Sequence, residues 1–296
     1  FKIEQSSKGT FLFDSIKQSN GAFALEINIA KSVVIQNSEF SVDVGTAINI
    51  KKVSNVLLNN VKFTNSQGSP LLSFKEIDHI VFDSFQLLNC KGVGSSPVLI
   101  DEYLTILVNN SLFDSNEGDV MSSVIHAQDE LNTIRPYSYI SVQSSNFYRN
   151  KMKIGSKGAL SKGGALLLTG TNRIIIDSCN FEENYSEKMA GDIYTLLTEE
   201  ETLISNCSFK KSVSKDSGGS IFANGKLMIH KSKFKSCKSH HGGCIFTNQE
   251  LSLVDVEIDE GEADEGGAIF GRGYSVFLYH TDFKNCKAKT SGGAIF

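Results

Sequence analysis

The residues best suited to chemistry lie in the stretch CKSHHGGC, which runs from Cys237 to Cys244. Two cysteines with His240 and His241 between them are ligand types that can close on zinc. The same corner in the last repeat reads CKAKTSGGA, where Cys286 matches Cys237 and no histidine occurs. Because that corner is built without a metal site, we favour buried thiols beside two solvent-facing histidines. Cys237, His240, His241 and Cys244 are the metal candidates that this sequence offers.

The glycine pair in this stretch belongs to a phrase that recurs at a fixed interval. GGSIF, GGCIF, GGAIF and GGAIF begin at positions 218, 242, 266 and 292. A phrase repeated with a period in the twenties is typical of stacked repeats. Towards the N-terminus the glycines of the phrase are often replaced, but its fourth position, Ile in these four copies, stays aliphatic and marks each repeat. That residue is Leu25, Ile48, Leu71, Val98, Val124, Leu166, Ile193, Ile221, Ile245, Ile269 and Ile295.

A second apolar ladder runs out of phase with the first. Apolar residues five positions before each of its rungs and smaller ones two positions before predict short strands rather than helices. Asn or Ser commonly lies three or four positions before a rung, between these two sets of residues. It predicts a bend there, because Asn tolerates a left-handed backbone. The glycine pairs predict a second sharp turn. The rungs are Phe40, Phe63, Leu87, Phe113, Phe147, Phe181, Phe209, Phe234, Ile258 and Phe283.

Together the ladders predict an all-β, right-handed parallel β-helix over residues 1–296, with about 11 coils of 23–28 residues and three short strands per coil. Stacking buries a continuous core that one repeat cannot bury alone. Loop insertions near 127–138 and 148–161 interrupt the period, and we expect both on one face. The chain starts at Phe1 and stops inside a repeat. We therefore expect a segment of a longer protein, with further coils or other chains covering both ends.

Composition excludes some classes of function. A net charge of −4, from 33 acidic and 29 basic residues, gives no general attraction to nucleic acid. No apolar run approaches 18 residues, so we expect no membrane span in this segment. Hydrophobic residues make up 40% of the chain, which is enough for a core.

The repeated GGAI together with FDSN, FYRN and FEEN (Phe113–Asn116, Phe147–Asn150 and Phe181–Asn184) resembles the repeats of chlamydial polymorphic membrane proteins. Those are surface adhesins of the pectin-lyase-like superfamily, and similar phrases occur in long β-helix proteins of protists. The resemblance implies the fold, and it implies an extracellular or cell-surface location. Half of the coils lack the glycine pair, and later rungs read FKKS, FKSC and FKNC.

Many enzymes of this fold act on acidic polysaccharides, and they carry recognisable catalytic residues. Hydrolases have paired aspartates beside NTD and GHG phrases, and lyases need a calcium cluster with an arginine base. This chain has no Asp-Asp pair, no NTD and no GHG. Its only arginines are Arg135, Arg149, Arg173 and Arg272, none within an acidic cluster. The sequence therefore predicts no catalytic residue and no cofactor.

Cysteines and sequons suggest covalent modifications. Cys179 and Cys207 share one slot on adjacent coils, which would lie within the separation that a disulfide permits. A reduced, buried pair is the alternative. Sequons occur at Asn109, Asn184 and Asn206. We expect Asn184, at the start of a corner loop, and Asn109 as candidate glycan acceptors.

We expect a non-enzymatic structural or adhesive segment of a large surface protein: a stiff rod, filament component or stalk. Surface glycans are candidate partners. One alternative is a polysaccharide lyase or hydrolase. Another is a receptor or ligand-binding module that uses the 127–161 loops, where Arg135, Tyr137, Tyr148 and Arg149 form a candidate contact surface.

Overall fold

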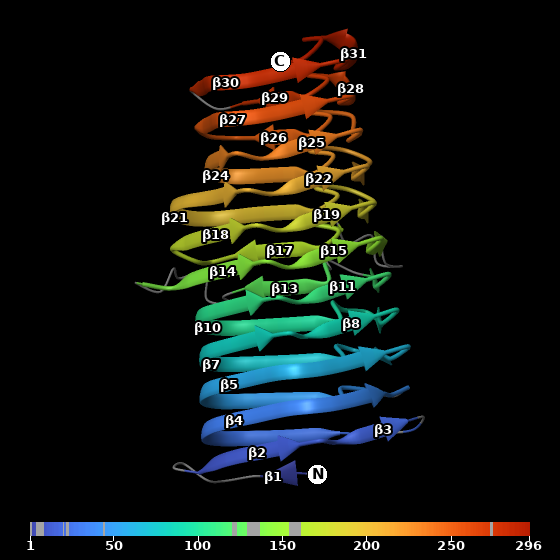
Figure 1. The fold of residues 1–296 in the computed structure, drawn as a ribbon, viewed down its shortest axis with the longest axis vertical. Helices are drawn as coiled ribbons and strands as arrows, with labels where there is room; N and C mark the ends of the chain where they lie inside the picture. Colours follow the sequence, from blue (N-terminus) through green and yellow to red (C-terminus); the bar gives the residue numbers. More distant parts are fainter. Residues whose placement is uncertain are drawn as a thin grey trace.

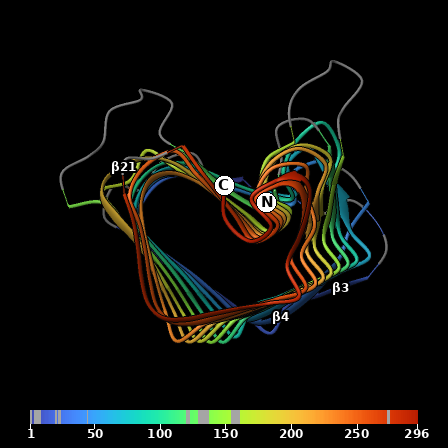
Figure 2. The ribbon, with the colours of Figure 1, turned by 90° about the horizontal axis from the view of Figure 1, so that it is seen from above.

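The computed structural model is a parallel β-solenoid of about ten turns, and no helix occurs among the residues that it describes. The strands on the near face of Figure 1 run from left to right as the chain climbs from N to C, so the coils wind in the predicted right-handed sense. Seen along the axis, the coils superimpose on one outline with a wide lobe, a narrower lobe and a notch between them (Figure 2). The structure describes residues 2–3, 9–19, 21, 24–43, 45–119, 123–128, 137–153, 161–272 and 275–296.

Each coil contributes strands to up to four columns, named a, b, c and d in chain order. Several long strands bend at a corner and belong to two or three columns. Columns a and b share β4 (Leu25–Ser41), β5 (Ile48–Thr64), β7 (Leu72–Asp83), β10 (Val98–Asn109), β21 (Ile193–Ser205) and β24 (Ile221–His230). Column a also holds β1 (Lys2–Ile3), β13 (Ile125–Gln128), β17 (Leu166–Thr169), β26 (Ile245–Thr247) and β29 (Ile269–Gly271). Column b also holds β2 (Thr10–Asp14), β14 (Tyr139–Gln143), β18 (Arg173–Asp177), β27 (Leu251–Asp259) and β30 (Val276–Lys284).

Columns c and d complete the coil. The ends of β4, β5, β27 and β30 continue into column c. The other members of column c are β3 (Lys17–Ser19), β8 (Gln86–Leu88), β11 (Leu112–Asp114), β15 (Asn146–Tyr148), β19 (Asn180–Glu182), β22 (Ser208–Lys210) and β25 (Lys233–Lys235). Column d holds β6 (Gln67–Gly68), β9 (Lys91–Gly92), β12 (Glu117–Asp119), β16 (Lys151–Lys153), β20 (Tyr185–Ser186), β23 (Val213–Ser214), β28 (Glu262–Glu265) and β31 (Lys287–Ser291).

The expected three strands per coil is therefore an undercount. Column d was missed because its strands are mostly two or three residues long and lack an apolar alternation, as in Lys91–Gly92 and Tyr185–Ser186. Its ladder is held by main-chain hydrogen bonds between coils, such as Lys91 N–H to Ser66 O at 2.8 Å.

The predicted aromatic ladder is confirmed. Phe113, Phe147, Phe181, Phe209 and Phe234 pair rung to rung. Their buried rings stack with centroids 4.5–4.9 Å apart and interplanar angles of 3–5°. Such stacking adds to the burial of apolar area, so the interior of the rod is a column of rings joined to one continuous core.

The aliphatic ladder is confirmed with two corrections. Ile48 and Val98 both pair with Leu72, and Val98 also pairs with Ile125, so the predicted rungs Leu71 and Val124 are one residue early. Leu71 and Val124 are buried as well. Because Leu71 and Leu72 are both apolar, as are Val124 and Ile125, the repeat period does not show which residue of each pair is the rung.

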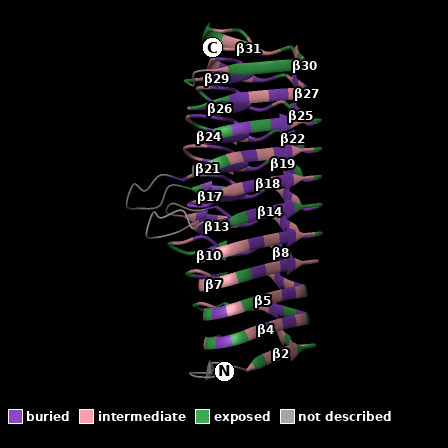
Figure 3. Ribbon diagram, turned by 90° about the vertical axis from the view of Figure 1, so that its left-hand side faces the viewer, coloured by how far each residue is buried: buried purple, intermediate pink, exposed green. Residues whose placement is uncertain are grey.

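Charged columns on the outer surface have the predicted register. Lys233 pairs with Glu257, which pairs in turn with Asp282. The ammonium groups of Lys233 and Lys284 lie 3.6 and 2.7 Å from the carboxylate of Glu257. These exposed pairs each contribute little to stability, but they favour this register over a shifted one. Figure 3 shows the buried bands of successive strands lining up along the rod.

The corners follow the expected chemistry. The bend between columns b and c has a left-handed residue in coil after coil, including Asn37, Asn60, Asn110 and Asn206 with φ of 48–52°. The two insertions, however, leave from different corners. The described ends of the first lie between β13 and β14, and those of the second lie between β16 and β17. Residues 129–136 and 154–160 lie outside the described part.

Candidate functional site

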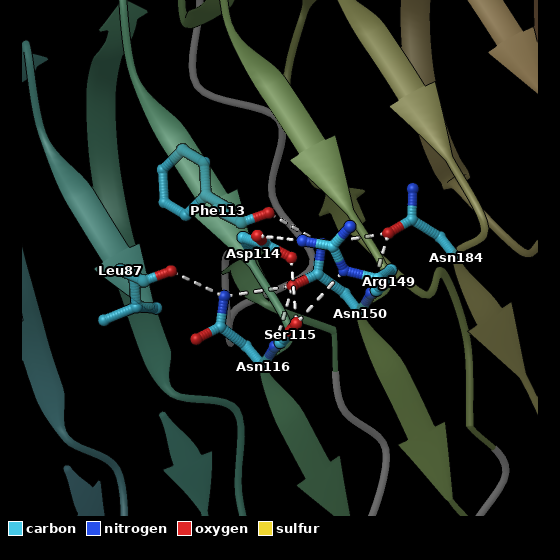
Figure 4. A network of polar contacts seen from close by, with 8 residues as sticks. All are labelled: Leu87, Phe113, Asp114, Ser115, Asn116, Arg149, Asn150 and Asn184. Carbon is cyan, nitrogen blue, oxygen red and sulfur yellow. Dashed lines mark hydrogen bonds and ion pairs between the residues drawn. The ribbon is translucent and has the colours of Figure 1, made fainter. Parts of the chain in front are cut away.

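A column of buried polar side chains runs along the interior where column c turns into column d. Asn116, Asn150 and Asn184 occupy the last position of the three FxxN phrases, and each is at most 1% exposed. Cys90 precedes them in the same slot, and its main-chain N–H donates to Asn116 Oδ1 at 2.9 Å. Figure 4 shows the amides pointing along the axis, one coil after another.

Each amide bonds to the coil on both sides of it. Asn150 Nδ2 donates to Phe113 O at 3.0 Å and to Asn184 Oδ1 at 2.9 Å. Asn150 Oδ1 accepts from the main-chain N–H of Asn116 at 3.1 Å and from its Nδ2 at 3.0 Å. Because buried amides are costly unless all their groups are bonded, this ladder fixes the register of the corner.

Asp192 ends the amide ladder and is the most perturbed acid of the described residues. It is fully buried, and its Oδ1 accepts a hydrogen bond from Asn184 Nδ2 at 2.9 Å. Among the described residues, its Oδ2 and the buried hydroxyl of Ser212 make no hydrogen bond of ordinary geometry. Burial raises the pKa of Asp192 to about 7, although the hydrogen bond from Asn184 acts in the opposite direction. The carboxyl group is therefore protonated in the folded protein at mildly acidic pH.

We predict that Asp192 makes stability fall as pH rises. The folded pKa of about 7 lies above the ordinary value of 3.8, so the folded state holds a proton that the unfolded state releases between those pH values. A pKa that differs by one between the two states corresponds to about 1.4 kcal/mol. Asp192→Asn should keep the acceptor for Asn184 and be more stable than the parent at pH 8, with little difference at pH 4. Urea unfolding across pH 4–8 measures this. Asp282→Asn, at an exposed carboxylate, is the control that should preserve the slope.

The cysteines of CKSHHGGC lie inside the rod. Cys237 and Cys244 are both fully buried, and Ser220 Oγ lies 3.0 Å from Cys237 Sγ. Burial raises the pKa of the Cys244 thiol well above its ordinary value. Both thiols lie in the same buried part of the rod as the amide ladder. Cys237 occupies the slot that Asn184 occupies in its coil, and Cys244 occupies the slot of Asp192 and Ser220.

The two histidines of that stretch lie on the outer surface. His240 Nδ1 pairs with Asp264, and His241 stands 3.8 Å from Asp216 and 3.6 Å from Glu265. The cysteines and the imidazoles thus lie on opposite sides of the backbone and do not converge. In the described part of the chain, no three His, Cys, Asp or Glu side chains are grouped so as to hold a metal ion.

A second aromatic column, which sequence reasoning missed, packs outside column a under the glycine corner. Its rings stack with centroids 4.7–5.2 Å apart. Lys162 lies over the first ring, and Arg272 lies over two others. The repeated F after GGxI was the available signal. The column consists of Tyr194, Phe222, Phe246, Phe270 and Phe296.

The candidate modification sites are placed differently from one another. Cys179 and Cys207 stack on adjacent coils as buried free thiols, with the main-chain N–H of Cys179 3.5 Å from Cys207 Sγ. Asn109 is half-buried at the bend before column c, and Asn206 is exposed there. Asn184 lies at the expected corner, but its amide is buried and donates to Phe147 O and Asp192 Oδ1.

The expected contact surface is divided in the structure. Tyr137 is 89% exposed and borders a hollow of about 360 Å³ on column b. Tyr148 and Arg149 lie at the far end of column c, where Arg149 pairs with Asp114 and its Nε donates to Ser115 at 3.3 Å (Figure 4). Arg135 lies outside the described residues.

The fold defines the chain as a parallel β-solenoid protein. No family model matches the chain, and no curated protein or solved structure matches it either. The predicted parallel β-solenoid is thus confirmed, and the resemblance to the pectin-lyase-like superfamily and to polymorphic membrane proteins stays a prediction. In the part of the chain that is described, no helix is long and apolar enough to cross a membrane.

Proposed function

We propose that the chain is a structural or adhesive rod segment of a larger extracellular or cell-surface protein, and not an enzyme. One observation carries the proposal: the side-chain ladders continue from coil to coil through the described stack. Rings, amides and aliphatic rungs each extend over successive coils. In a stack of this kind each coil is held in place by its two neighbours, which makes the rod stiff, while the residues on its outer surface can vary.

The chemistry of the described side chains agrees with a passive role. The carboxyl group whose pKa is raised most, that of Asp192, is fully buried inside the rod, where a polysaccharide cannot reach it. Many of the exposed acids are engaged in ion pairs between coils, as Asp264 is with Lys289 at 2.7 Å. These pairs hold the pKa of Asp264 down at about 2, which suits a fixed anion better than a general acid.

We expect the intact chain to leave acidic and neutral polysaccharides uncut. The measurement is the release of reducing ends and of unsaturated products over a panel of soluble polysaccharides at pH 5–9, with and without calcium. Turnover that co-purifies with the chain and is lost on substitution of an exposed carboxylate would move the enzyme alternative to first place.

A further inference from the structure

An aliphatic stripe runs along the outside of column b over the length of the described rod. Its residues point away from the core and pair rung to rung between neighbouring coils, so they form one straight column. Nine of the eleven are apolar. The stripe consists of Leu12, Val34, Leu57, Val81, Leu107, Ser141, Ile175, Leu203, Met228, Ser252 and Phe277.

The stripe is in contact with solvent. Leu12, Met228 and Phe277 are 62%, 36% and 57% exposed, the aliphatic residues between them are half-buried, and Ser141 is buried. Along a strand with one face in water, the side chains that point to the water are normally polar. The apolar runs of the stripe, which Ser141 and Ser252 interrupt, therefore mark an interaction site.

The stripe is flanked by two columns of mostly uncharged residues. The flank five residues before the left-handed bend residue includes Ser32, Asn55, His79, Thr105, Tyr139 and Arg173, and it continues in later coils as Glu201 and Lys226. The flank next to the bend includes Gln36, Asn59, Asp83, Asn109, Gln143 and Asp177. Two hollows of about 480 and 360 Å³ open on this face and are lined by residues of the stripe and its flanks.

The area of this face fits a protein interface. Eleven rungs about 4.8 Å apart span about 48 Å, and three columns about 6.7 Å apart span about 13 Å between centres and about 20 Å with their outer side chains, so the face covers roughly 600–1,000 Å². A stable pair of proteins buries about 800 Å² on each partner. The face is apolar along most of its centre, which suits packing of one sheet on another.

We propose that two copies of this chain pair side by side through the column b face, parallel and with each coil opposite its own equivalent. A two-fold axis along the rods places the stripe of one copy on the stripe of the other. It also brings each flank against the opposite flank of the second copy. This lateral pairing does not depend on the proposed surface location and differs from end-to-end stacking of coils.

Charge complementarity selects the parallel arrangement. Arg173 and Asp177 are the two ends of β18 and lie on opposite flanks of the same coil. In the parallel pair, Asp177 of one copy faces Arg173 of the other, and Asp83 faces His79 in the same way. An antiparallel pair would instead set each flank against the same flank of the second copy, so Asp177 of one copy would not meet Arg173 of the other.

Sedimentation equilibrium of the intact chain over 0.1–100 μM tests the pairing. We expect a concentration-dependent dimer, and at least about a 100-fold weaker dimer for Val81→Glu with Leu107→Glu, because two carboxylates would be buried in an apolar contact. The matched control is Leu88→Glu with Leu112→Glu, at half-buried aliphatic residues of the same two coils on column c. This control should dimerise as the parent does. A parent that is monomeric throughout, as expected if the hollows hold a glycan instead, overturns the proposal. So does a dimer that the stripe variant leaves intact while thermal melts show it folded.

Cysteine cross-linking tests the register. Asn55 and Asn59 lie on opposite flanks of one coil. An equimolar mixture of Asn55→Cys and Asn59→Cys chains should form a disulfide-linked dimer on mild oxidation, while each variant alone should not. Cross-linking of either variant with itself, or none in the mixture while sedimentation shows dimers, contradicts the parallel pair. The parent, with its own six cysteines, is the background control.

Discussion

Gly243→Ala is expected to destabilise the protein by about 3–5 kcal/mol. A Cβ atom at Gly243 would lie 2.0 Å from Gly267 O and 2.7 Å from Glu262 N, both of which belong to backbone of the neighbouring coil. Since that backbone is held in the inter-coil ladder, relief of the clash requires hydrogen bonds to break. The second glycine of the repeated phrase is thus required by the spacing between coils. The first, with φ of 65° at Gly242, is required by its conformation.

Thermal and urea unfolding of Gly243→Ala measure this effect, and two alanine variants are its controls. At Gly271 the nearest atom to a new Cβ is 3.7 Å away, and at Gly293, the same position of the last GGAIF, nothing lies within 4 Å. Both should lie within about 1 kcal/mol of the parent. A Gly243→Ala protein as stable as these controls would show that the coils are not packed as described.

Asn150→Ala is expected to cost about 3–5 kcal/mol, because it removes the middle of the buried amide ladder. The amide of Asn116 and its main-chain N–H lose their acceptor, and the carbonyl of Phe113 loses its donor. None of these groups can reach water, since Asn116 and Phe113 are fully buried. The loss is therefore that of unsatisfied polar groups and a small cavity, which exceeds the value of one hydrogen bond.

Asn180→Ala provides the comparison for Asn150→Ala. Asn180 Nδ2 donates to Asn146 Oδ1 of the neighbouring coil at 2.9 Å, but the pair is exposed. Water can replace that bond, so the expected loss is below about 1 kcal/mol. Equal losses for the two variants, measured by urea unfolding, would show that the buried ladder is not the fixed element inferred from its geometry.

The repeat could be predicted from the sequence because its rungs are aromatic or aliphatic at nearly constant spacing. Phe147 and Phe181 recur with apolar and small residues at fixed offsets before them, and only stacking buries them all. The left-handed corners at Asn37 and Asn60 were predictable for the same reason, since few residue types adopt that backbone.

The polar interior could not be predicted by the same reasoning. An Asn such as Asn184 favours a corner loop by its residue type, and only the path of the chain shows that its amide points inward. Asp192 occupies a slot filled in other coils by Ala, Ser or Cys, so no period marks it. The outer stripe on column b was missed because its apolar residues alternate with those of the core along the same strands. A continuous apolar run of that kind does not show which of its two faces is buried.

Surface labelling of intact source cells tests the central claim, that this rod acts outside the cell, most directly. Antibodies raised against the folded chain should label non-permeabilised cells, and brief protease treatment of those cells should remove the signal. Labelling that requires permeabilisation, with full protection from external protease, would contradict an extracellular or cell-surface rod.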